Sequence, residues 1–206
     1  MAVYEVLNAV TMIPSPCILY ARAVNFAGLL ACSAIATQVP FSIVYHSYES
    51  FKIIQGITDC RIDNHLRRMD QTMQHIAQIV LTYAITQSVL YTEAIACFHC
   101  VACVQLWHPS TTNDGKRWCM VAIGVCAYTL PLLLKHQFII FSYAVFPMVI
   151  GCVFAFVPAF KFNGAHALMH VGGWMHADAI GIILSTRHDY LNATHEGHPN
   201  VGFVFI

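Results

Sequence analysis

The sequence predicts an all-α, polytopic membrane protein: a single domain, residues 1–206, built as a seven-transmembrane-helix bundle. The first observation is composition, with 58% hydrophobic and only 10% charged residues. Soluble domains average about 45–50% apolar and about 25% charged residues. Ten basic and ten acidic side chains cannot make the polar shell that a soluble fold of this length needs. The second observation is a succession of about seven apolar stretches long enough to span a bilayer.

The N-terminal half of the chain contains four of these stretches. The first covers residues 3–21 and includes Pro14 and Pro16, which a span tolerates where neighbouring groups satisfy the freed backbone. Glu5, in place of a basic leading region, argues against a cleavable signal peptide. The other predicted elements are a second span at 24–46, a polar segment at 47–69, a third span at 70–88 and a fourth at 89–107.

The C-terminal half contains the remaining three stretches. Residues 108–117, HPSTTNDGKR, are rich in turn formers and predict a loop. Predicted spans then follow at 118–134, 138–160 and 166–185, and a polar tail at 186–206 closes the chain.

Basic residues predict the orientation of these spans. With seven spans, the loops on the N-terminal side hold seven of the ten Lys and Arg residues, and the opposite side holds three. Because cytosolic loops carry the excess of basic residues, the N-terminal side is predicted to be cytosolic and the C-terminal tail to lie outside. The net charge of zero gives no reason to expect a nucleic-acid partner.

Two short motifs and one carboxylate predict a functional site. Ser42 and His46 are four residues apart near the end of the second span, and His166 and His170 are four apart at the start of the seventh. Residues at this spacing share one face of a helix. Asp70 begins the third span. Polar groups inside a span are costly and are therefore functional candidates.

The predicted topology places these residues at similar depth on the same side of the membrane. Three imidazoles with an open fourth position are a common catalytic zinc site. A nearby carboxylate then orients or deprotonates the attacking water, and a hydroxyl binds a ligand or a developing oxyanion. The alternative is that the histidines of this motif only form hydrogen bonds within the bundle.

The ordered set Ser42-x3-His46, Asp70 and His166-x3-His170 resembles the pattern of one seven-span superfamily, which comprises the alkaline ceramidases, the adiponectin/progestin receptors and myomaker-like proteins. The string VPFSIVYHSYES, followed by Cys60 and LRRMD, resembles the myomaker-like branch in particular. This resemblance implies a zinc ion held by His46, His166 and His170, with Asp70 and Ser42 as catalytic residues. Asp63 is a rival carboxylate, and the myomaker-like branch implies the opposite orientation to the one predicted from charge.

Other buried polar residues have alternative interpretations. His75 and His99, in the third and fourth spans, fit a pair of haem ligands or interhelical hydrogen bonds, of which the second is favoured. His176 falls on a different face from His170, and Gly172-Gly173 favours close helix packing.

Three functions are consistent with these features. The first is a zinc-dependent integral-membrane hydrolase acting on a lipid, with amide hydrolysis as in the ceramidase branch. The second is a non-enzymatic, membrane-remodelling protein with a structural zinc, as in the myomaker-like branch. The third is an accessory subunit of a larger membrane complex. The expected partners are membrane lipid and either a membrane-protein complex or a second copy of the chain.

Overall fold

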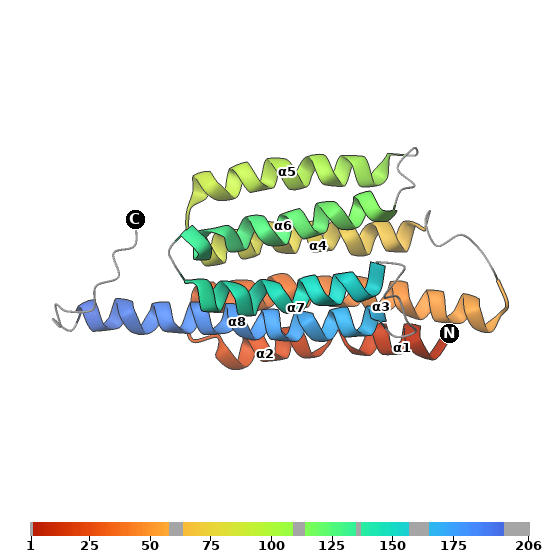
Figure 1. Ribbon diagram of the computed structural model, residues 1–206, viewed down its shortest axis with the longest axis horizontal. Helices are drawn as coiled ribbons and strands as arrows, with labels where there is room; N and C mark the ends of the chain where they lie inside the picture. Colours follow the sequence, from red (N-terminus) through yellow and green to blue (C-terminus); the bar gives the residue numbers. More distant parts are fainter. Residues whose placement is uncertain (1, 58–63, 109–113, 135–136, 157–164, 196–206) are drawn as a thin grey trace.

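The computed structural model describes residues 2–57, 64–108, 114–134, 137–156 and 165–195. These residues form helices and no strands, which confirms the all-α prediction for the described part of the chain. The elements in order are α1 (Ala2–Val10), α2 (Pro14–Arg22), α3 (Phe26–Ile54), α4 (His65–Thr86), α5 (Val89–Trp107), α6 (Asp114–Leu134), α7 (Phe138–Phe156) and α8 (Ala165–His195). Figure 1 shows the helices running roughly along the long axis of the molecule, with α5 at one edge and α1, α2 and α8 toward the other.

The first predicted span is two helices rather than one. The chain turns at residues 11–13, and α2 begins with Pro14 in its first turn. Proline is accepted there because the first N–H groups of a helix have no intrahelical partner. Together the two helices still cover enough apolar sequence to cross a membrane.

Two helices extend beyond the spans predicted from hydrophobicity. α3 has 29 residues and continues eight residues past His46. At 1.5 Å per residue, such a helix is about 43 Å long, which exceeds the roughly 30 Å hydrocarbon core. In its last turns, Lys52 Nζ lies 3.2 Å from Glu49 Oε1, so that charge is paired. α8 likewise continues to His195, through the first half of the predicted tail.

The other helix boundaries agree with those predicted from the sequence or differ from them by about one helical turn. α5 covers residues 89–107 as predicted. The short join before it depends on Gln87, which adopts a left-handed φ of 52° at the end of α4. α4 and α6 start earlier than predicted, at His65 and Asp114. Asp70 therefore lies in the second turn of α4 rather than at the start of a helix.

Four segments among the described residues are long and apolar enough to cross a membrane: Ala2–Arg22, Phe26–Ile54, Val89–Trp107 and His166–Thr186. α6 and α7 contain shorter apolar stretches, and α4 carries a row of buried polar side chains instead. The edge helix α5 exposes Leu90 and Val104, as expected of a helix that faces lipid. These features indicate a membrane protein.

Apolar side chains of several helices, including α8, meet in one buried cluster. Leu19, Leu81, Ile180 and Leu184 belong to one buried apolar cluster contributed by α2, α4 and α8 together with α3 and α6. α7 and α8 approach so closely that a Cβ on Gly172 would lie 2.6 Å from the carbonyl oxygen of Pro147. Small residues permit this approach in membrane bundles. The first turns of α8 are thereby held against the bundle.

Candidate metal centre

Three histidines from two helices meet at one end of the bundle. His46 comes from α3, and His166 and His170 come from the first two turns of α8. Their ring centroids are 5.0 Å apart for His46–His166, 5.8 Å for His46–His170 and 4.8 Å for His166–His170. One ligand nitrogen from each ring lies within 4.8 Å of the other two. The structure thus brings together the three residues that the sequence predicts as metal ligands.

The donor set, three imidazole nitrogens, fits a transition-metal ion. His46 and His170 are buried, and His166 is half-buried. His46 uses Nδ1 in a 2.8 Å contact with Glu5, which leaves Nε2 as its ligand nitrogen. His170 Nε2 is buried with no hydrogen-bond partner in the described structure. A buried polar atom without a partner costs roughly 1–3 kcal/mol, and a metal ion would remove that cost. The three histidines could hold a metal ion.

Asp70 and Ser42 lie beside this cluster. Ser42 is one helical turn before His46 and is fully buried, and Asp70 is 5% exposed. The carboxylate of Asp70 has Ser42 and Gln38 as polar neighbours and lies within electrostatic range of His46. Ser42 Oγ and Asp70 Oδ1 make no hydrogen bond of good geometry to the described residues, although Ser42 and Gln38 are close enough to the carboxylate to interact with it. Both groups therefore have capacity to bind a water or a substrate atom. The rival carboxylate Asp63, like Cys60, lies outside the described residues.

Two residues of the site were missed by the sequence analysis. Glu5 Oε2 contacts His46 Nδ1 at 2.8 Å, and Asn8 Nδ2 donates to the same oxygen at 3.1 Å. All three side chains are buried. The signal that could have found Glu5 is its position, because it is an acidic residue in the middle of an apolar stretch.

The other buried histidines form internal hydrogen bonds. His75 Nδ1 and His99 Nδ1 are 2.9 Å apart, as the interhelical hydrogen-bond interpretation predicts. His176 places Nδ1 2.7 Å from the carbonyl oxygen of Ala144, and the Tyr128 hydroxyl lies 2.5 Å from its Nε2. Since Nδ1 must donate to the carbonyl, Nε2 accepts from Tyr128. Both nitrogens of His176 are occupied, and His176 is no ligand.

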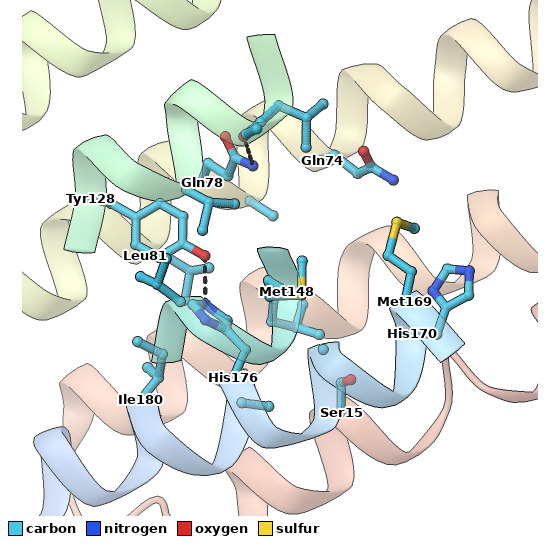
Figure 2. Close-up of a pocket in the computed structure, with 18 of the residues that line it drawn as sticks. Ser15, Gln74, Gln78, Leu81, Tyr128, Met148, Met169, His170, His176 and Ile180 are labelled. Atoms are coloured by element: carbon cyan, nitrogen blue, oxygen red, sulfur yellow. Dashed lines mark hydrogen bonds between the residues drawn. The ribbon is translucent and has the colours of Figure 1, made fainter. Parts of the chain in front are cut away.

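A cavity of about 420 Å³ begins at His170 and continues into the bundle. It is lined mainly by apolar side chains of α2, α3, α4, α6, α7 and α8. Figure 2 shows Met169 and His170 at one end and the Tyr128–His176 hydrogen bond several residues further along α8. Gln74 and Gln78 of α4 are among the few polar lining residues. This volume falls within the roughly 300–1,000 Å³ of small-molecule sites.

Comparison of the chain with protein-family models, with curated proteins and with solved structures gave no match. The superfamily resemblance therefore depends on the motif residues themselves, and function has to be argued from the geometry of the site.

Proposed function

We propose that this chain is a zinc-dependent integral-membrane hydrolase that cleaves an amide bond in a lipid. One observation carries the proposal: His46, His166 and His170 converge with Asp70 and Ser42 beside them, and His170 also lines an apolar cavity. The same ordered residues define the resemblance to the alkaline ceramidase superfamily.

Each residue has a role in this reaction. When bound, zinc would polarise a substrate carbonyl and lower the pKa of a water molecule toward about 7. Asp70 accepts the proton of the attacking water and delivers it to the leaving amine. Ser42 donates a hydrogen bond to the substrate carbonyl oxygen, where negative charge develops. The apolar cavity holds the acyl chain and excludes bulk water from the site.

The ligand set favours a catalytic metal over a structural one. Structural zinc sites have four protein ligands, whereas catalytic sites have three and an open position. Among the described residues, the group that could hold a metal consists of the three histidines alone. Asp70 is a neighbour of this group and not a member of it. A site of this composition retains room for water and substrate.

The proposed topology is multi-pass, with seven spans. α1 and α2 together form the first span, and the six helices α3 to α8 supply the others. α4 counts as a span because its buried polar residues, such as Gln74 and Gln78, face the interior of the bundle rather than lipid.

A hydrolysis assay on the purified chain tests the proposal. Long-chain N-acyl amides and matched esters are offered in mixed micelles, and released fatty acid is measured by mass spectrometry. We expect amide cleavage that falls by about 10²–10⁴-fold in Asp70→Asn, since the general base is lost while the histidines remain. Glu93→Gln, the same chemical change at an exposed position on α5, is the matched control and should keep full turnover.

Absence of cleavage of every lipid by a zinc-loaded wild-type chain would contradict the hydrolase proposal. A zinc site that only braces the helices would then be the better account. Comigration with a large complex in mild detergent would instead favour the accessory-subunit function.

A further inference from the structure

The short first helix reaches into the metal centre through one side chain. Glu5 of α1 places Oε2 2.8 Å from Nδ1 of His46, and the two side chains are 8% and 2% exposed. The site that emerged from the sequence motifs does not include α1. A buried carboxylate in an apolar helix is costly unless it is hydrogen-bonded or paired.

We propose that Glu5 is a positioning residue for the metal centre: its carboxylate orients His46 and selects the tautomer that presents Nε2 to the ion. This inference rests on the proposed zinc site. Metal-binding histidines usually donate their second N–H to a carboxylate or carbonyl, which fixes the ring and raises the basicity of the ligand nitrogen. The Glu5–His46 pair has the distance and the burial of that arrangement.

Asn8 holds the carboxylate in place. It lies one turn after Glu5 on the same face of α1, and its Nδ2 donates to Glu5 Oε2 at 3.1 Å. The oxygen that contacts His46 is therefore fixed by a second hydrogen bond. Carboxylates that support a metal ligand are commonly hydrogen-bonded themselves.

The position of α1 is in turn tied to both ligand-bearing helices. At its start, Ser50 Oγ of α3 donates to the carbonyl oxygen of Ala2 at 3.2 Å. At its end, Trp174 Nε1 of α8 donates to the carbonyl oxygen of Thr11 at 2.6 Å. The break before Pro14 sets α1 apart from α2 as a separate helix. α1 thus connects the helix of His46 with the helix of His166 and His170.

The test is a zinc-affinity measurement on the full-length chain in detergent, by competition with a chelator of known affinity. We expect Glu5→Ala to weaken zinc binding by about 10–100-fold, the usual effect of removing such a partner. Glu5→Gln should weaken it less, because the amide oxygen can still accept the Nδ1–H bond. Glu49→Gln is the matched control, since Glu49 is also buried but its carboxylate contacts Lys52 and Asn64; its zinc affinity should equal that of the wild type.

Two further readouts separate positioning from simple helix packing. The melting temperature of the metal-free protein reports packing of α1, whereas the visible spectrum of the cobalt-substituted protein reports the geometry of the ligands. We expect Glu5→Gln to alter the cobalt spectrum. Wild-type zinc affinity and an unchanged cobalt spectrum in Glu5→Ala would overturn the inference. A wild-type chain that binds zinc but cleaves no lipid would overturn the proposed reaction and leave the role of Glu5 intact.

Discussion

Two groups of histidines inside this bundle differ in how their ring nitrogens are arranged and in what these nitrogens contact. Where α3 meets the start of α8, His46, His166 and His170 converge. There Nδ1 of His46 contacts the carboxylate of Glu5. Between α4 and α5, His75 and His99 instead hydrogen-bond to each other through their Nδ1 atoms. In the first group one nitrogen from each of three rings lies within 4.8 Å of the other two. The second group is a single pair of rings joined through Nδ1, and His99 Nε2 has no hydrogen-bond partner within the described residues. Burial of histidine, or one buried nitrogen without a partner, therefore does not identify a metal site; the convergence of three ligand nitrogens does.

The largest loss of stability is expected from a substitution that removes the His75–His99 hydrogen bond. His99→Ala removes a fully buried ring and leaves His75 Nδ1 without its partner. The combined cost of the vacated volume and the lost hydrogen bond is about 2–4 kcal/mol. We expect a lower melting temperature in detergent and unchanged zinc content. Loss of zinc together with an unchanged melting temperature would contradict the distinction between the two groups.

A smaller effect is expected from the helix contact that positions His170. A methyl group at Gly172 would lie 2.6 Å from the oxygen and 2.9 Å from the carbon of the Pro147 carbonyl, so α8 must shift away from α7. Gly172→Ala should cost about 1–3 kcal/mol and weaken zinc binding, since His170 is two residues away. Gly173→Ala is the control, because its nearest neighbours are 3.8 Å away or more.

Chelator competition and thermal melting measure both glycine variants. Equal zinc affinities and equal melting temperatures for Gly172→Ala and Gly173→Ala would show that the close approach of α7 and α8 does not position the metal ligands. The sequence pair Gly172-Gly173 predicted close packing at both positions, and the structure assigns the tight contact to Gly172.

The helices were predictable where hydrophobicity and helix length coincide. α5 agrees with its prediction at both ends because Ser88 caps it and its apolar run ends with the helix. α3 and α8 were predicted too short, because hydrophobicity marks the membrane and not the end of backbone hydrogen bonding. The turn between α1 and α2 was missed, although Pro14 marks the place where the chain begins a new helix.

The candidate site was predictable where its residues lie one turn apart. Ser42 with His46, and His166 with His170, share a helix face, so local spacing was sufficient. Glu5 was not found because it lies 41 residues before His46, and their contact requires α1 to fold back against α3. The residue that hydrogen-bonds to the second nitrogen of a metal-binding histidine is brought there by the tertiary structure, and the spacing of residues along the chain does not predict it.

The most direct test of the metal centre is the metal content of the detergent-purified chain, by mass spectrometry. Wild type, His46→Ala and His170→Ala are compared with His75→Ala as the control from the other histidine group. We expect about one zinc per chain in the wild type and in His75→Ala, and none in His46→Ala or His170→Ala. A wild-type chain without zinc, or equal zinc in all four proteins, would contradict the assignment of His46, His166 and His170 as a metal centre.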